Sequence, residues 1–406
     1  MISLEDGQRR ILDTVTPLPA AEVRLRDARG LVLAADVVSP EVVPPFANTA
    51  MDGYAVRAAD TRGATADHPV QLRVVGELPA GTAPSVAVSA GEAIRIMTGA
   101  PLPDGADAVV MVERTTADRD DVSILAEAQS GDHIRPAGGD LQAGQRVFER
   151  GTLLTPAHLG VLASIDLPSV VAHPRPRVGV MSTGDELVEH GALAPGKIRD
   201  SNRPMLLAVV EEAGCAAVDY GIVRDDEALL TATITKAVDE CDAVLTSGAV
   251  SMGDYDYVKV VLDRLAHERP DSSFQWMQVA IKPAKPLAFA ALEGVPVFGL
   301  PGNPVSSRVS FELFARPALR RLMGRIDVLP EAIRAVAGSA MPRRRDGKVY
   351  LDRVVVRVES GRYVCERAGF QASNVLSGMA AANALAVLPD GEGVAAGEPV
   401  DVLLLT

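Results

Sequence analysis

The spacing of hydrophobic and polar residues changes several times along the chain, and each spacing predicts a different kind of secondary structure. Residues 1–45 begin with a helical pattern and continue as short apolar stretches that Gly30 and Pro40 interrupt. From about residue 70 to 150 the apolar runs are short and β-like, and Gly, Pro and Asp turns separate them. These runs are QLRVVGEL, EAIRIM, DAVVMVE, VSILAE and QRVFER. The pattern predicts a β-rich region with its own core.

Strands and helices alternate from Pro176 onward. The run RVGVMST predicts a strand, and in SNRPMLLAVVEEAG the residues Leu206 and Val209 recur at helical spacing, with Ser201 or Asn202 available as a cap. The same order returns in AAVDYGIV with RDDEALLTATITKAVDE, in AVLTSGA with DYDYVKVVLDRLA, and in VPVFGL with PGNPVSSRVSFELFARPALRRLM. Such alternation is typical of a mainly parallel sheet that helices cover on both faces.

Length and charge limit the class of protein. A chain of 406 residues exceeds one ordinary core and indicates roughly two to four domains, and after about residue 327 a β pattern returns in KVYLDRVVVRVES, GRYVCERA, ALAVLP and PVDVLLL. The net charge of −13 argues against a nucleic-acid surface, because such a surface needs clustered Lys and Arg. No apolar run approaches the roughly 20 residues that span a bilayer, and MISLEDGQRR does not resemble a secretory signal. We expect a cytoplasmic protein that binds neither nucleic acid nor membrane.

Cysteines and histidines show no site pattern. Cys215, Cys241 and Cys365 are far apart and form no CxxC pair, so they predict reduced, mostly buried thiols and neither a zinc site nor a disulfide framework. The six histidines are scattered, and only His133 lies near a candidate loop. A nucleophilic triad is therefore not supported.

Four loops fall where the predicted parallel strands end, which is where ligands bind in a doubly wound sheet. Their Gly and Ser residues allow a close approach of backbone N–H groups to phosphate or another oxyanion, and the following helix adds its positive end. Each loop alone is equally compatible with a purely structural turn. The loops are Ser182-Thr183-Gly184-Asp185-Glu186, Ile222-Val223-Arg224-Asp225-Asp226, Thr246-Ser247-Gly248-Ala249-Val250-Ser251 and Gly299-Leu300-Pro301-Gly302-Asn303-Pro304.

The same loops carry carboxylates. Converging carboxylates beside a phosphate site suit Mg²⁺, which keeps several waters and takes only one or two protein oxygens. The alternative is helix capping, which for Asp225 and Asp226 is equally well supported. The acids are Asp185, Glu186, Asp225, Asp226, Asp254 and Asp256.

Lysines and a second set of tight turns add further candidates. Lys282 and Lys285 in AIKPAKP could bind phosphate as point charges, although a lysine pair is more often a solvated face. In PPFANTAMDGYAV a dense turn exposes Asp52, and MTGAP and RPAGGD place Thr98 and Asp140 in similar turns. Because the scattered histidines do not support catalysis by a histidine, the reaction that fits these residues is metal-assisted cleavage of a phosphoanhydride.

Read together, these segments resemble the molybdopterin molybdenumtransferases of the MoeA family, which include the C-terminal domain of gephyrin. The matching stretches run in family order from about residue 44 to 310. They are PPFANTAMDGYAV, IRIMTGAPLPDGADAVVMVE, IRPAGGDLQAG, VGVMSTGDELV, GKIRDSN, LTSGAVSMGDYDYVK, IKPAKPLAF and FGLPGNPVSS.

The resemblance implies an α/β and β multidomain fold in an elongated homodimer. It implies a doubly wound MoaB/Mog-like domain at 176–327, similar to the molybdopterin adenylyltransferases, and a C-terminal β-barrel-like domain at 328–406. The N-terminal part would comprise a β-rich domain at 46–146 and a discontinuous linker or dimerisation domain at 1–45 and 147–175.

The resemblance also implies an Mg²⁺-dependent transferase that takes molybdate and adenylylated molybdopterin and releases AMP, with the adenylyltransferase and molybdoenzyme apoproteins as partners. Its site would be shared between subunits: Asp52, Thr98 and Asp140 of one chain would approach a catalytic, metal-binding and substrate-binding set of the other. Within that set Asp185, Glu186 and Asp256 would hold the metal. The set comprises Ser182, Thr183, Gly184, Asp185, Glu186, Asp225, Ser247, Gly248, Ser251, Asp256, Lys282, Lys285, Pro301, Gly302, Asn303, Pro304 and, near molybdate, Ser377.

Two departures from the family pattern concern the loops. Ala249 stands where the family usually has Gly, and Gly139 stands where it usually has an acid. Two other functions stay open: the adenylyltransferase itself, against which the long N-terminal region argues, and a non-catalytic carrier or scaffold of the cofactor.

Overall fold

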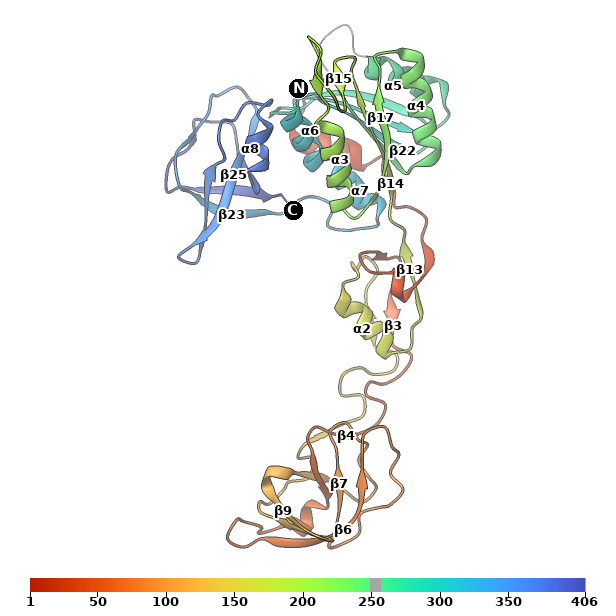
Figure 1. Cartoon of the computed structure of the whole chain (residues 1–406), viewed down its shortest axis with the longest axis vertical. Coiled ribbons are helices and arrows are strands. Elements are labelled where there is room, and N and C mark those ends of the chain that lie inside the picture. The colour runs from red at the N-terminus through yellow and green to blue at the C-terminus, as the bar shows by residue number, and fades with distance from the viewer. Residues whose placement is uncertain (249–256, 406) are drawn as a thin grey trace. The chain divides into compact units, whose positions relative to one another are not determined.

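The computed structural model describes residues 1–248 and 257–405 (Figure 1). The chain forms two compact units. Unit 1 comprises Met1–Ala34, Gly151–Thr155 and Val170–Thr406, and unit 2 comprises Ala35–Arg150 and Pro156–Ser169. None of the described helices is long and apolar enough to cross a membrane.

A six-stranded sheet forms the centre of unit 1. Its strand order is β17-β14-β18-β22-β21-β19, and β17, β14, β18 and β22 run parallel, as the alternating pattern predicts. The last two strands pair antiparallel, so the sheet is mixed at one edge. The bounds are β14 Arg177–Thr183, β17 Ala216–Val223, β18 Ala243–Ser247, β19 Ser273–Gln278, β21 Pro286–Leu292 and β22 Val295–Leu300.

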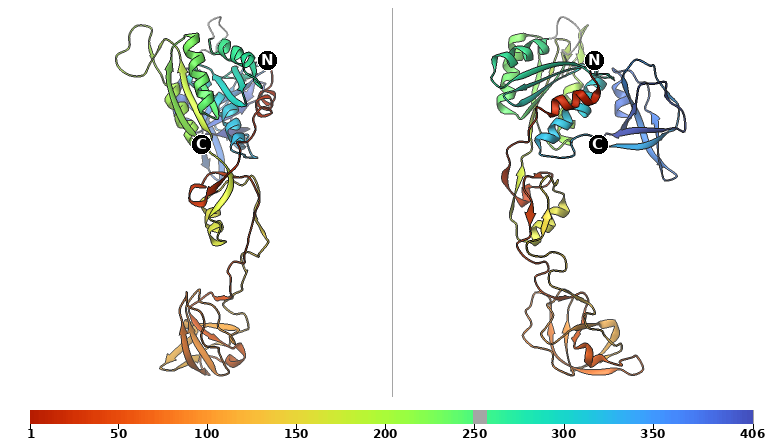
Figure 2. Two further views of the ribbon diagram at one scale, coloured as in Figure 1. Left: turned by 90° about the vertical axis from the view of Figure 1, so that its right-hand side faces the viewer. Right: turned by 180° about the vertical axis from the view of Figure 1, so that it is seen from behind.

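Helices cover both faces of this sheet (Figure 1). Because successive strand residues point to opposite faces, Val180 and Leu245 pack with Leu206 of α3, whereas Met181 and Val244 pack with Leu230 of α4. The first face carries α1 (Leu4–Leu12), α3 (Asn202–Glu212), and α6 (Pro304–Ser310), which continues through a π-helical turn (Phe311–Ala315) into α7 (Arg316–Leu322). The second carries α4 (Glu227–Glu240) and α5 (Tyr257–Glu268). The N-terminal helix α1, red in Figure 2, contacts α7.

The C-terminal part of unit 1 closes into a five-stranded barrel. The strands follow one another as β25-β26-β23-β29-β27, and β27 pairs back onto β25, so the ring has no free edge. A short strand, β20 (Ile281–Lys282), joins it by pairing parallel with β25. The barrel-like domain expected from the sequence is confirmed. Its strands are β23 Ala332–Ala337, β25 Val349–Glu359, β26 Arg362–Arg367, β27 Ala384–Leu388 and β29 Pro399–Leu404.

Unit 2 is β-rich, as the short apolar runs predict. Its main sheet has the order β8-β5-β7-β6-β10-β9 and buries apolar residues on both faces. The strands are β5 Gly53–Val56, β6 Val70–Leu78, β7 Glu92–Ile96, β8 Ala108–Met111, β9 Thr115–Asp118 and β10 Asp121–Ile124. Two small pairs, β4 (Asn48–Thr49) with β11 (Ile134–Arg135) and β3 (Val37–Val38) with β12 (Arg146–Phe148), and the helix α2 (Pro156–Ser164) complete the unit.

A small three-stranded sheet in unit 1 has the order β1-β13-β2, with β1 Ala21–Arg24, β2 Val32–Leu33 and β13 Ser169–His173. The three cysteines are free and buried, as expected. Burial raises the pKa of the Cys215 thiol to about 12, and it also raises the pKa values of Cys241 and Cys365.

Candidate functional site

The parallel strands of unit 1 bring three of the predicted loops to one edge of the sheet. In the strand register Ser182 of β14 lies beside Ser247 of β18, and Ser247 lies beside Leu300 of β22. The residues that follow each strand therefore meet at the carboxyl end. This edge, with the loops at 182–186, 246–248 and 299–304, is called the strand-end site below.

Glycine is required where these loops touch. Gly248 has a φ of +111°, and a Cβ built on it would lie 2.1 Å from the carbonyl oxygen of Thr183. A Cβ on Gly302 would lie 3.6 Å from the Gly248 Cα, which is an ordinary contact. The N–H groups of Gly184 and Gly248 donate to the carbonyls of Val223 and Leu300 at 3.3 Å. Both backbone N–H groups are therefore used in hydrogen bonds between the loops and neighbouring strands. The polar groups still available to a ligand belong mainly to side chains.

Asn202 links the strand ends from the first turn of α3. Its Nδ2 donates to Ser247 Oγ and to the carbonyl oxygen of Gly302, both at 2.7 Å. The Oδ1 of Asn202 and the Oγ1 of Thr183 are buried and have no hydrogen-bond partner among the described residues. Since buried polar atoms are normally paired, both atoms have hydrogen-bonding capacity left for a ligand. The sequence suggested Asn202 only as a helix cap, and its side chain instead serves the site.

The loop at 222–226, which follows β17 beside the strand-end site, carries two acids that play different parts in the structure. Asp226 is the cap of α4, because its Oδ1 accepts a hydrogen bond from the N–H of Leu229 at 2.9 Å. Asp225 does not cap; its Oδ2 accepts from the N–H of Asp185 at 3.2 Å, and its Oδ1 is buried without a partner among the described residues. Helix capping, which the sequence allowed for both acids, therefore applies to Asp226 and not to Asp225.

Two further carboxylates belong to the loop at 182–186, which contacts Asp225 through the N–H of Asp185. Asp185 is exposed and accepts from Nε of Arg224 at 3.4 Å, while a Cβ on Gly184 would lie 2.5 Å from Glu186 Oε2, so the Glu186 carboxylate folds back over the loop. Within residues 1–248 and 257–405 no three side chains of the His, Cys, Asp and Glu types form a ready-made metal group. Five residues named from the sequence, Ala249, Val250, Ser251, Asp254 and Asp256, lie outside the described residues.

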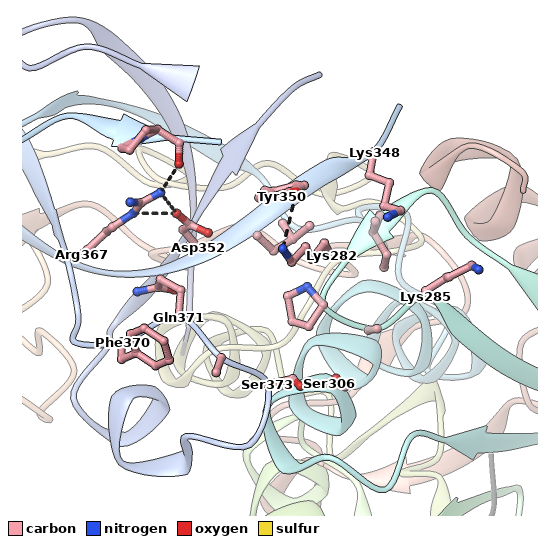
Figure 3. A pocket seen from close by; sticks show the side chains of 16 residues that line it. Lys282, Lys285, Ser306, Lys348, Tyr350, Asp352, Arg367, Phe370, Gln371 and Ser373 are labelled. Carbon is pink, nitrogen blue, oxygen red and sulfur yellow. Dashed lines mark hydrogen bonds and ion pairs between the residues drawn. The ribbon is translucent and has the colours of Figure 1, made fainter. Parts of the chain in front are cut away.

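A basic cavity of about 640 Å³ opens next to the strand-end site (Figure 3). Both predicted lysines, Lys282 and Lys285, line it, together with Ser306 of α6 and Ser373 of the barrel domain. Lys348 contributes a third ammonium group. We refer to it as the lysine cavity.

Hydrogen bonds join the lysine cavity to the strand-end site. Nδ2 of Asn303 donates to Ser373 Oγ at 3.2 Å, and the N–H of Val305 donates to the Ser373 carbonyl at 3.2 Å. The buried guanidinium of Arg353 holds the same barrel loop by donating to the carbonyls of Phe370 and Ala372 at 2.5 and 2.9 Å. Pro301, Gly302, Asn303 and Pro304 therefore lie between the two parts of the site. Ser377 is exposed at the start of α8 (Leu376–Ala380), and Ser373 rather than Ser377 lines the cavity.

Unit 2 brings Asp52 and Thr98 together. The Oδ1 of Asp52 accepts hydrogen bonds from both the N–H and the Oγ1 of Thr98 at 2.7 Å. These two donors, the N–H first, lower the pKa of the Asp52 carboxyl. Asp140 lies on another loop of unit 2, where its N–H donates to the Val43 carbonyl and its side chain is exposed. At the neighbouring Gly139 a Cβ would lie 3.1 Å from the Pro136 carbonyl, so glycine suits this turn.

Sequence reasoning missed four contributors: Asn202, Ser306, Lys348 and Ser373. Ser306 and Ser373 carry no local signal, because they reach the cavity only through the docking of the barrel domain on α6. Lys348 had a weak signal, since it is the first residue of the predicted β run KVYLDRVVVRVES.

Comparison with known proteins covers nearly the whole chain. Three family models match: "MoeA N-terminal region (domain I and II)" over residues 2–165, "Probable molybdopterin binding domain" over 179–321, and "MoeA C-terminal region (domain IV)" over 334–405. The chain is 41% identical to molybdopterin molybdenumtransferase 2 of Mycobacterium tuberculosis over 408 residues, with both chains fully covered. It is 38% identical to the molybdopterin molybdenumtransferase of Nostoc, covering all of this chain and 94% of that one.

Among solved structures, the chain resembles a molybdopterin biosynthesis moeA protein from Pyrococcus horikoshii. The TM-score is 0.84 at 30% identity, and both chains are covered completely.

Proposed function

Since the chain belongs to the MoeA family, we propose that it is a molybdopterin molybdenumtransferase that inserts molybdate into adenylylated molybdopterin and releases AMP. One observation carries the proposal: a strand-end site with unsatisfied polar groups is hydrogen-bonded, through Asn303 and Ser373, to a cavity lined by three lysines. The strand-end site suits the phosphate end of a nucleotide-like substrate, and the lysine cavity suits a small dianion.

The strand-end site would hold the phosphoanhydride. Thr183 offers a buried hydroxyl that can donate to a phosphate oxygen, and the amide oxygen of Asn202 can accept from a hydroxyl or N–H of the substrate. Gly248 and Gly302 leave the backbone bare where a phosphate must approach closely. Adenylylated molybdopterin carries both a pterin phosphate and a nucleotide phosphate, so a site at the junction of three loops would bind one and orient the other.

The lysine cavity would receive molybdate. Lys282 and Lys285 supply charge, and Ser306 and Ser373 supply hydroxyl groups that can donate to an oxyanion. The cavity is adjacent to the strand-end loops, so an anion bound there would lie next to a substrate anchored at the strand ends.

Mg²⁺ fits the acids of the strand-end site. Asp225 has a buried oxygen without a partner among the described residues, and its other oxygen accepts from the N–H of Asp185, whose loop also carries Glu186. These acids suit an ion that takes one or two carboxylates and completes its shell with water and phosphate. When bound, the ion would supply positive charge against the phosphate that leaves with AMP. We assign Asp185, Glu186 and Asp225, with Asp256, to this role.

A second copy of the chain would complete the site with Asp52, Thr98 and Asp140. The hydrogen bonds from Thr98 keep Asp52 ionised and fixed, which suits a carboxylate that orients a substrate or a metal-bound water. We therefore propose a homodimer with two shared sites.

The first test is molybdate-dependent release of AMP. Purified protein, adenylylated molybdopterin and Mg²⁺ should release AMP in proportion to the molybdate supplied, and Asp52→Ala or Glu186→Ala should abolish the release. Incubation with molybdopterin and Mg-ATP should give no adenylylation. Binding without AMP release would contradict the proposal and favour a carrier, whereas adenylylation would favour the adenylyltransferase.

Mixing the two inactive variants tests the shared site. In a mixed dimer of Asp52→Ala and Glu186→Ala subunits, one site contains both substitutions and the other contains neither. Random exchange of subunits should therefore restore about a quarter of the wild-type activity. A mixture that stays inactive while dimers exchange would show that each subunit forms its own site.

A further inference from the structure

The segment at 184–200, which leads from β14 to α3, buries little apolar surface. Residues 189–199 are all exposed, and the two residues of β15 (Leu187–Val188) are half-buried. A short parallel pairing of β15 with β16 (Ile198–Arg199) orders the backbone. The segment begins next to Asp185 and Glu186, so the contacts that fix it also fix these two carboxylates.

Arg203, in the first turn of α3, joins this segment to the sheet. Its side chain is 7% exposed, and it donates from Nε to Asp200 Oδ2 at 3.1 Å, from Nη2 to Glu189 Oε1 at 2.8 Å and from Nη1 to Asp219. Glu189 and Asp200 lie at the two ends of the exposed stretch, and Asp219 belongs to the edge strand β17. A single planar guanidinium therefore ties both ends of the stretch to the edge of the sheet.

Asp200 extends these contacts to the strand-end site. Its side chain is 1% exposed, and its Oδ1 accepts hydrogen bonds from Ser182 Oγ at 2.9 Å and from the N–H of Arg203 at 3.2 Å. A carboxylate at this depth is tolerated because an ion pair and hydrogen bonds satisfy both of its oxygens. Asp200 thereby fixes the end of β14 against the start of α3, where Asn202 lies.

Asp219 connects the guanidinium to the strand that leads to Asp225. β17 contains a one-residue bulge after Asp219, where its register with β14 shifts. The N–H of Gly221 donates to Asp219 Oδ1 at 2.8 Å, and the φ of Gly221 is +74°. Bulges beside sites change the direction in which a strand presents its residues. The contact between Arg203 and Asp219 therefore holds the bulged end of β17, from which the loop with Asp225 departs.

We propose that Arg203 is a positioning residue of the strand-end site and that Asp200 is its partner in this role. The guanidinium fixes the segment at 184–200 and the end of β17, and these two parts of the chain lead to Asp185, Glu186 and Asp225. The inference rests on the proposed function, in which these acids bind Mg²⁺ beside the phosphoanhydride. Groups directly behind metal ligands orient them, and their loss weakens metal binding or activity about 10- to 100-fold. Arg203 acts through other residues and takes part in no covalent step.

Hydrogen–deuterium exchange of the full chain tests whether Arg203 fixes the segment. In Glu189→Ala the guanidinium loses its contact at the start of the exposed stretch but keeps its two other partners, so the protein should fold. The N–H groups of Ile198 and Asp200 donate within the segment at 2.9 and 3.0 Å. Both should exchange about two- to fivefold faster, as expected for the loss of one partly exposed ion pair.

Glu293→Ala is the matched control. The Glu293 side chain is 46% exposed, against 57% for Glu189, and its carboxylate accepts from the Arg269 guanidinium at 2.9 Å. It lies in the turn before β22, at the end of this strand opposite to the strand-end site. This variant should leave exchange in the segment at 184–200 unchanged, and both variants should melt within about 2 °C of wild type.

The Mg²⁺ concentration at half-maximal AMP release tests whether the positioning matters for the site. Arg203→Lys keeps the positive charge but replaces the guanidinium by one ammonium group, which does not match three separate carboxylates. The Mg²⁺ requirement should rise about tenfold, and saturating Mg²⁺ should restore most of the rate. Arg316→Lys is the control for a buried guanidinium, because Arg316 pairs with Glu312 and Glu212. It should lower the melting temperature as Arg203→Lys does, but keep the wild-type Mg²⁺ requirement.

The outcomes separate the two proposals. Faster exchange in both Glu189→Ala and Arg203→Lys, together with a raised Mg²⁺ requirement in Arg203→Lys, supports the inference. Unchanged exchange overturns it, and so does faster exchange with a wild-type Mg²⁺ requirement, because Arg203 then acts on structure alone. In both cases molybdate-dependent AMP release by the wild-type protein leaves the proposed function standing. If the wild-type protein releases no AMP, the proposed function is wrong and the inference falls with it.

Discussion

The contact between Gly248 and Thr183 makes a quantitative prediction for the substitution Gly248→Ala. The added methyl group would lie 2.1 Å from a backbone carbonyl oxygen, which no side-chain rotation can move away. The φ of +111° adds a second penalty, because residues with a Cβ avoid that region. Either β14 and β18 must separate at their carboxyl ends or the loop must change conformation.

Known costs of these effects give the magnitude. A left-handed conformation costs a non-glycine residue about 1–2 kcal/mol, and forced overpacking costs about 1–3 kcal/mol. The free energy of unfolding should therefore fall by about 2–5 kcal/mol. At about 2–4 °C per kcal/mol for a large domain, the melting temperature of unit 1 should fall by roughly 4–20 °C.

Calorimetry measures the melting transition, and Gly302→Ala provides the matched control. A Cβ on Gly302 meets only an ordinary contact of 3.6 Å, so this variant should melt within about 2 °C of wild type. It should nevertheless bind adenylylated molybdopterin more weakly, because the methyl group occupies space at the strand-end site. A Gly248→Ala protein with an unchanged melting temperature would refute the reasoning about the loop contact.

Three other predictions concern single contacts. Thr98→Val removes one of the two donors to Asp52 and keeps the N–H, so the pKa of Asp52 should rise only part of the way to its ordinary value in an NMR titration; the stabilising effect of this carboxylate is lost as the pH falls through its folded pKa. Burial holds the pKa of Cys215 at about 12, so the thiol should resist labelling at pH 8 in the native protein and react after unfolding; the folded state prefers the protonated thiol, and this stabilisation is lost as the pH rises from about 9 to 12. Asn202→Ala should lower the free energy of unfolding by about 1–3 kcal/mol in urea, whereas Ser201→Ala, whose side chain makes no cap bond, should change it by less than about 0.5 kcal/mol.

Local sequence patterns predicted the individual strands and helices of this fold better than they predicted which strands pair and in which direction. The four parallel strands and the helices that follow them were predicted from apolar periodicity, and the meeting of their loops follows from parallel pairing, whereas β19 and β21 were not predicted. The antiparallel direction of β19 and β21 does not follow, since periodicity carries no information on strand direction. The closure of the barrel through β25 and β27 is likewise a long-range pairing that no local signal encodes.

The candidate site shows the same division. Lys282 and Lys285 could be named because prolines mark their segment, whereas Ser373 joins the cavity only through contact between two distant parts of the chain. Asp225 and Asp226 were indistinguishable in sequence, and only the direction of their side chains shows that Asp226 caps a helix and Asp225 does not.

The N-terminal helix has a consequence for how the protein is made. Gln8 of α1 donates to the carbonyl oxygen of Leu313, 305 residues later, so α1 is synthesised long before the part of the α/β layer on which it packs. At about 5–20 residues per second, that wait is roughly 15–60 s, during which the amphipathic face of α1 has no native partner. Unit 2 can fold in the meantime, and unit 1 is completed only after most of the chain has been synthesised. Chaperone dependence in newly made protein should therefore concentrate on α1, which is translated well before the residues that cover it.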